Sequence, residues 1–162
     1  MNEEMLKHQR FLVINGTMIL LAAFILGFGF LFFITGEISL WPIPGKIEYQ
    51  MPGTYDAWRM AHMEGIVNGL MLWLIAALLP VFSSFVKNIK WLVIIPPIIS
   101  WSIVIASSFD PLFPEARGLL FDASTNLMND IAFLIFYPGV LLSFVFVIGI
   151  LVAARRHAKK AS

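Results

Sequence analysis

Four long apolar segments limit what this chain can fold into more than any other feature of its sequence. They cover approximately residues 11–35, 58–82, 91–109 and 130–154. A helix of about 20 apolar residues crosses the hydrocarbon core of a bilayer, and each segment is near that length. With 59% hydrophobic residues among 162 and a mean hydropathy of +0.85, the chain lies outside the usual range of soluble domains. The sequence therefore predicts an all-α integral membrane protein, a four-helix transmembrane bundle that forms a single membrane domain over residues 1–162.

The connecting segments are polar and contain residues that interrupt helices. Residues 36–56 include three prolines and three glycines, so they are predicted to form a loop. Residues 83–90 are predicted to be a short turn and residues 110–129 a second loop. Thr54 is expected to cap the second helix, and capping of the fourth helix is the role expected of Asp130.

The basic residues are divided unequally between the two sides of the predicted membrane. Eight share the side of both termini, namely Lys7, Arg10, Lys87, Lys90, Arg155, Arg156, Lys159 and Lys160. Three lie on the other side, namely Lys46, Arg59 and Arg117. The positive-inside rule therefore places both termini in the cytoplasm. Because the basic run at the end of the chain directly follows an apolar segment, it is interpreted as an anchor in the lipid headgroups. The predicted partner is the lipid bilayer and not nucleic acid.

The second apolar segment differs from the others because its first half carries His62, Glu64 and Asn68. Polar groups are costly in hydrocarbon and usually face a cavity, a partner helix or a cofactor. His62, Gly65 and Gly69 stand at i, i+3 and i+7, so they share one helix face. This face has two interpretations. It offers a nitrogen ligand above a shallow trough for a flat cofactor, or Gly65-x-x-x-Gly69 is a helix-contact motif.

The ligands available to this chain restrict its chemistry. It contains no cysteine, which excludes thiolate haem ligation, iron–sulfur clusters and disulfides. His62 is the only histidine within a predicted span, and Glu64 lies about 200° around the helix from it, so Glu64 cannot orient it as a catalytic triad requires. Zinc needs three or more protein ligands, whereas haem needs only one axial nitrogen.

Several motifs in and after the second segment resemble the styrene oxide isomerase family of small bacterial four-helix membrane enzymes. In the second segment the resemblance rests on Pro52-Gly53, Trp58, Ala61-His62, Asn68-Gly69 and Leu79-Pro80. It continues through Trp101, Arg117-Gly118-Leu119, Phe121 and Asp130-Ile131. The block from His62 to Asn68 is the most specific part, and the resemblance covers most of the chain.

The resemblance implies a homotrimer in the bacterial inner membrane, with haem b at the subunit interfaces. The ferric iron of that haem would act as a Lewis acid on a small hydrophobic aryl epoxide and give an aldehyde by a Meinwald rearrangement. By resemblance, His62 is the axial ligand of the iron, and Gly65 and Gly69 contact the cofactor. Asn68 is the catalytic amide that helps to place the epoxide oxygen.

The chain departs from the family on the third helix. The family has an aspartate and a tyrosine in the active site there, and the matching residues are Ile99 and Ser107. The first hypothesis is therefore a haem b-dependent epoxide isomerase-like enzyme with an altered pocket. The alternative is a non-catalytic membrane haem protein for electron transfer or ligand sensing. A third hypothesis is a structural membrane subunit without cofactor, in which the glycines only pack helices.

Overall fold

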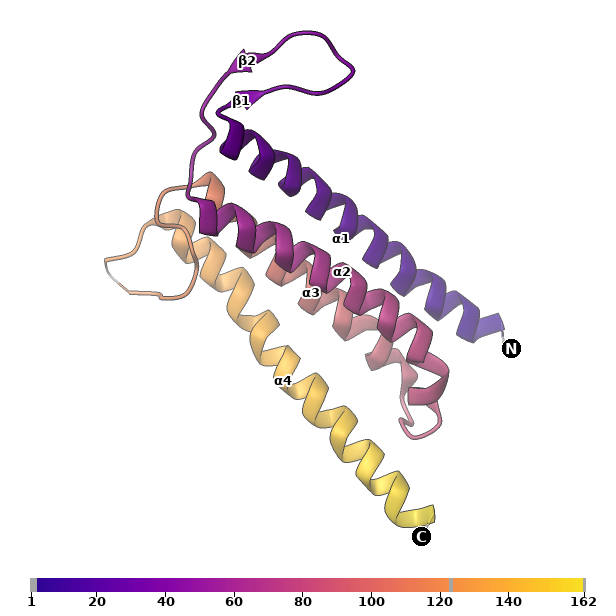
Figure 1. Ribbon diagram of the computed structural model, residues 1–162. Coiled ribbons are helices and arrows are strands. Elements are labelled where there is room, and N and C mark those ends of the chain that lie inside the picture. Colours follow the sequence, from indigo (N-terminus) through magenta and orange to yellow (C-terminus); the bar gives the residue numbers. More distant parts are fainter. Residues whose placement is uncertain (1–2, 123, 162) are drawn as a thin grey trace.

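The computed structural model describes residues 3–122 and 124–161. It contains four long helices and one short antiparallel hairpin, arranged as Figure 1 shows. The helices are α1 (Glu3–Thr35), α2 (Tyr55–Ser83), α3 (Ile89–Leu112) and α4 (Leu127–Ala161), and the strands are β1 (Glu37–Ile38) and β2 (Ile47–Glu48). All four helices are long and apolar enough to cross a membrane. The prediction of an all-α, multi-pass membrane protein is thus confirmed.

The helices form a row in which α2 and α3 are central and α1 and α4 lie at the two sides. The α1 helix packs along α2, α2 along α3 and α3 along α4, with a smaller contact between α1 and α3. The apolar parts of α2 and α3 are correspondingly more buried than those of α1 and α4. Both termini and the α2–α3 turn lie at one end of the row, which we call the basic end. The hairpin and the α3–α4 loop lie at the opposite, hairpin end.

The outer two helices are longer than the predicted spans. The α1 helix begins at Glu3 and not near residue 11, and α4 continues to Ala161 and not only to residue 154. Backbone hydrogen bonding continues where hydropathy falls, and Lys7 supports the first turns of α1 by an ion pair of 3.0 Å with Glu3. At the hairpin end, α3 includes Asp110, which was expected in a loop.

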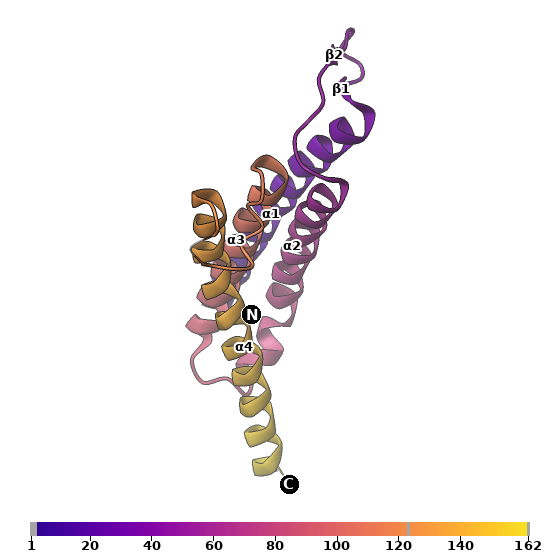
Figure 2. The same ribbon diagram turned by 90° about the vertical axis from the view of Figure 1, so that its left-hand side faces the viewer.

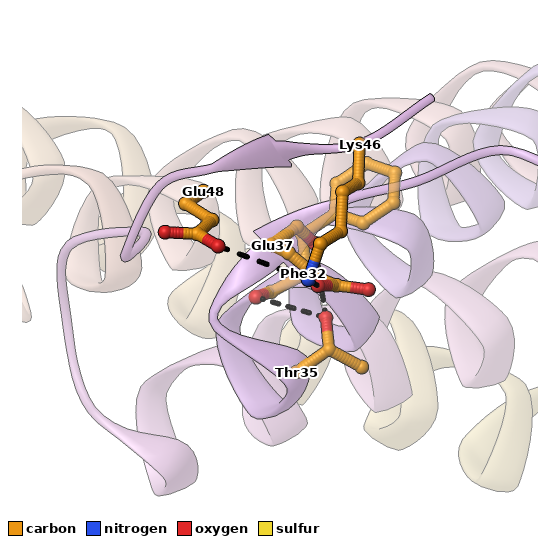
Figure 3. Close-up of polar contacts among 5 residues, drawn as sticks. All are labelled: Phe32, Thr35, Glu37, Lys46 and Glu48. Atoms are coloured by element: carbon orange, nitrogen blue, oxygen red, sulfur yellow. Dashed lines mark hydrogen bonds and ion pairs between the residues drawn. The ribbon is translucent and has the colours of Figure 1, made fainter. Parts of the chain in front are cut away.

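A two-stranded hairpin lies beyond the end of α1 (Figure 3), within the segment predicted to be a loop. Glu37 pairs with Glu48 across the strands, and Lys46 lies between these two carboxylates at 2.9 and 3.8 Å. Thr35 donates to the carbonyl oxygen of Glu37 at 3.0 Å. Each strand has only two residues, too few for a periodic pattern, and exposed ion pairs contribute little stability.

The start of α2 is fixed by contacts from the preceding loop. Thr54 accepts a hydrogen bond from the backbone N–H of Ala57 at 3.2 Å, so the predicted cap is confirmed. The fully buried Trp58 donates from Nε1 to the carbonyl oxygen of Pro52 at 2.7 Å. Its ring lies against Gly29, where a Cβ would be 2.4 Å from it. The loop and α1 together fix the position of the first half of α2, which carries His62, Glu64 and Asn68.

The α3–α4 loop is held by asparagines. The buried Asn129 accepts from the N–H of Gly118 at 2.8 Å and donates to the carbonyl oxygen of Leu120 at 2.7 Å. Asn126 accepts from the N–H of Asn129 at 2.9 Å and therefore caps α4. This corrects the expectation for Asp130, whose carboxylate accepts from the Thr125 hydroxyl instead.

Candidate functional site

His62 lies on the side of α2 that faces α1. Its Nδ1 is 2.8 Å from the carbonyl oxygen of Ala23. Its ring lies against Gly27, where a Cβ would be 2.8 Å from Cε1 and 2.9 Å from Nδ1. Because Gly27 has no side chain, the imidazole fits between α1 and α2.

The contact with Ala23 fixes the tautomer of His62. A carbonyl oxygen only accepts hydrogen bonds, so Nδ1 must carry the proton, and Nε2 of the neutral ring keeps its lone pair. Among the described residues, Nε2 has no hydrogen-bond partner. Metal-ligating histidines usually donate their second N–H to a carbonyl or carboxylate in this way, which orients the ring. His62 thus has one ring nitrogen held by the backbone and a second with a free lone pair.

Gly65 and Gly69 face α1 on the same side as His62. A Cβ on Gly65 would lie 2.6 Å from the Cβ of Ala23, and one on Gly69 would lie 3.0 Å from the carbonyl oxygen of Gly16. The space above the two glycines is therefore filled by α1, and the helix-contact interpretation of Gly65-x-x-x-Gly69 is confirmed. Contact of either glycine with a cofactor stays a prediction.

We expect Gly65→Leu to destabilise the protein by about 1–3 kcal/mol, because overpacking forces α1 and α2 apart. The measurement is thermal unfolding in detergent, together with the elution volume on gel filtration. Val67→Leu is the matched control, since Val67 lies on the exposed side of the same helix. Equal stability of the two variants would contradict close α1–α2 packing at Gly65.

Asn68 lies on a different side of α2 from His62. Helix geometry separates the two side chains by about 120°, so one chain does not bring them together. The Asn68 side chain donates from its amide nitrogen, Nδ2, to the backbone carbonyl oxygen of Glu64 at 2.9 Å. One of its two N–H groups is thereby engaged, and the second remains for a ligand.

One turn before Asn68, the Glu64 side chain borders a small polar cavity between α2, α3, α4 and the α3–α4 loop. The cavity has a volume of about 120 Å³. Its wall is formed by Met60, Glu64, Ser107, Asp110, Arg117, Leu119 and Phe136. It therefore combines two carboxylates, a guanidinium and a hydroxyl near the hairpin end of the row.

The charged groups of this cavity are only partly paired. Arg117 approaches Asp110 with 3.8 Å between Nε and Oδ2 and Met60 with 3.9 Å between Nη2 and Sδ. The Ser107 side chain interacts with Glu64, but Oε2 of Glu64 is buried and has no hydrogen-bond partner in the described chain. Buried polar atoms are rarely left without a partner. This oxygen therefore marks a place where water or a ligand group can donate.

The two third-helix residues described above as departures from the resemblance lie in different surroundings. Ser107 lines the cavity, whereas Ile99 is buried in the apolar core between the helices. The sequence did not indicate that Glu64, Asp110 and Arg117 would meet. The sequence predicts that Glu64 faces a cavity, a partner helix or a cofactor, and it places Asp110 and Arg117 in the loop that follows α3, but it does not predict their contact.

The side chains that could bind a metal are scattered. Among residues 3–122 and 124–161, no three histidine, cysteine, aspartate or glutamate side chains are grouped so that they could hold a metal ion. His62 is thus a single nitrogen donor. This arrangement suits a group that needs only one axial ligand from the protein.

Comparison with protein families gives one finding that covers most of the chain. Residues 8–155 match the family described as styrene oxide isomerase. No curated protein matches the chain significantly. The matched range includes α2 with His62 and Asn68, most of α1, all of α3 and the part of α4 within the predicted span. The chain belongs to the styrene oxide isomerase family.

Proposed function

We propose that this protein is a membrane-embedded epoxide isomerase that uses haem b held by His62. Membership of the styrene oxide isomerase family supports an isomerase-like function. The observation that carries the haem assignment is the 2.8 Å contact between Nδ1 of His62 and the carbonyl oxygen of Ala23, because it leaves the lone pair of Nε2 available. Bound haem would supply a Lewis-acidic ferric iron for the epoxide oxygen.

The protein's own residues would orient the substrate. Isomerisation breaks one carbon–oxygen bond and moves one hydrogen to the neighbouring carbon, so no atom is gained and no co-reactant is required. The unengaged N–H of Asn68 would donate to the oxygen as negative charge builds on it. Glu64 lies on the same side of α2, and its carboxylate would favour positive charge on the adjacent carbon.

We propose that the site lies at an interface between copies of the chain. His62 and Asn68 lie on different sides of α2, so a substrate near both must be bordered by two subunits. Large apolar faces of α1 and α4 are exposed in the single chain, which leaves area for such a contact. We therefore propose a homo-oligomer, a trimer by family resemblance.

The experiment uses the full-length protein, expressed with adequate haem supply and purified in detergent. We expect an absorption spectrum of ferric haem with one open coordination position, and aldehyde formation from aryl epoxides. The product analysis must separate the aldehyde from the diol that water would give. A haem-loaded protein that converts none of a panel of aryl and alkyl epoxides would leave only haem binding. A colourless protein would contradict both assignments.

We also propose that the basic end lies in the cytoplasm and the hairpin end in the periplasm of a bacterial inner membrane. The supporting observation is that both ends of the chain lie at the same end of the row as the α2–α3 turn, which carries Lys87 and is followed directly by Lys90 at the start of α3. A reporter enzyme that folds only in the periplasm should be inactive after Ser162 and active when inserted after Ile43 in the hairpin. The reverse pattern of activity would overturn this orientation.

A further inference from the structure

A groove of about 780 Å³ opens at the basic end of the protein. It lies between the α2–α3 turn and the last turns of α4, far along the row from the polar cavity at the hairpin end. Its volume falls within the range of small-molecule sites, roughly 300–1,000 Å³. The proposed isomerase chemistry uses none of its residues.

One wall of the groove is strongly cationic. It contains Lys87 from the turn and Arg156, Lys159 and Lys160 from α4, and no residue that lines the groove is acidic. Lys87, Arg156 and Lys160 form no ion pair with any residue of the described chain. Lys87, Arg156 and Lys160 repel one another where they share a groove with no acidic residue in its lining, so the site favours an anionic ligand.

The other wall is apolar and belongs to the part of the protein that crosses the membrane. Trp91 packs edge-on against Phe146, with 5.1 Å between the ring centroids. The same ring lies over Gly149, where a Cβ would be 2.8 Å from it. Gly149 and the exposed Val152 continue this wall along α4. The groove therefore has a charged end and an apolar end, as an amphipathic ligand does.

We propose that this groove binds the phosphodiester headgroup of an anionic phospholipid, with the beginning of its acyl chains along Trp91 and α4. Phosphate oxygens suit the lysines and the guanidinium of Arg156, which can bind them through two N–H groups. A free phosphate shares this chemistry, but it would leave the apolar wall without a partner. Basic pockets between transmembrane helices are known to select anionic headgroups.

The same end of the protein offers a matched control for charge. Lys90 and Arg155 lie beside the groove residues in the sequence and carry the same charges, but they do not line the groove. If the basic residues only anchor the protein in the headgroups, both pairs should contribute equally. If the groove is a site, only Lys87 and Arg156 should matter for tight binding.

The experiment compares full-length wild type with the double variants Lys87→Gln/Arg156→Gln and Lys90→Gln/Arg155→Gln in detergent. Phosphatidylglycerol and phosphatidylcholine are titrated, and retained lipid is counted by native mass spectrometry alongside thermal unfolding. We expect wild type and the Lys90/Arg155 variant to retain phosphatidylglycerol and to be stabilised by it. We expect the Lys87/Arg156 variant to bind it at least tenfold more weakly. If that variant does not fold, the two single variants are measured in the same way, and a weakening of several-fold is expected from each.

Three outcomes would overturn the proposal. Equal weakening in both double variants would show non-specific attraction to the headgroups. Equal retention of phosphatidylcholine would show that charge is not recognised. Displacement of phosphatidylglycerol by millimolar inorganic phosphate would show a site for a soluble anion.

Discussion

Haem binding should be lost in His62→Ala, while the protein still inserts and elutes as wild type does. The reason is that the His62 ring is oriented by a 2.8 Å contact between Nδ1 and the carbonyl oxygen of Ala23, which leaves Nε2 as the nitrogen that would bind the iron. Removal of a group that only orients a ligand typically lowers metal affinity about 10–100-fold, and removal of the ligand itself should exceed that. The measurement is the ratio of haem to protein in the purified sample, with the absorption spectrum.

Two further variants separate ligation from general damage. His157→Ala removes an exposed imidazole at the basic end and should keep full haem occupancy. Gly27→Ala keeps the ligand but places a Cβ 2.8 Å from the ring carbon Cε1, so it should shift the spectrum and weaken haem binding. Added imidazole should restore part of the haem in His62→Ala. Full occupancy with an unchanged spectrum in His62→Ala would reject the assignment.

The number and type of helices were predictable because the bilayer imposes a length that hydropathy alone reveals. The helix ends were not predictable from hydropathy. A predicted span ends where the residues become polar, whereas a helix ends where its backbone hydrogen bonds end. Residues 3–10 are polar and still helical. At the other end of the chain, α4 continues through its basic residues.

The pattern around His62 did not indicate which residues of α1 would lie against it. Gly65 and Gly69 suit a flat cofactor and a close helix equally well, and only the position of Ala23 and Gly16 against them shows that α1 fills this face. Nothing local in the sequence gives the contact between His62 and Ala23, which are 39 residues apart. The prediction of His62 as a ligand rested on its uniqueness and on resemblance.

The polar cavity could not be predicted because it depends on how a loop folds. Arg117 reaches Met60, 57 residues away, and Asn129 holds the neighbouring backbone by accepting from the N–H of Gly118. Gly118 has a φ of +67°, a conformation that favours glycine, and a Cβ there would lie 2.8 Å from the backbone of Ala132. Arg117-Gly118 is one of the motifs that resemble the family, but the sequence does not indicate that Arg117 contacts Met60 on α2.

Turnover of aryl epoxides should fall about 100–1,000-fold in Asn68→Ala, as it typically does when one donor to a developing oxyanion is removed. The Asn68 amide has one N–H on the carbonyl oxygen of Glu64, so its position is fixed before substrate arrives. A donor that needs no reorganisation stabilises the transition state more than the bound epoxide. The loss should therefore appear in kcat, measured as the rate of aldehyde formation at saturating epoxide under oxidising and reducing conditions.

Haem content is the control that distinguishes a lost hydrogen bond to the epoxide oxygen from a loss of bound haem in Asn68→Ala. Asn68→Ala should bind as much haem as wild type, with the same spectrum, because His62 is on another side of α2.

Glu64→Gln keeps the backbone carbonyl that accepts from Asn68 and removes only the carboxylate charge. If that charge favours the cationic carbon, Glu64→Gln should also slow turnover while Asn68 stays in place. Unchanged kcat in a haem-loaded Asn68→Ala would show that the amide does not act on the epoxide oxygen. If kcat falls in Asn68→Ala but not in Glu64→Gln, the amide acts on the epoxide oxygen and the carboxylate of Glu64 does not contribute to the reaction.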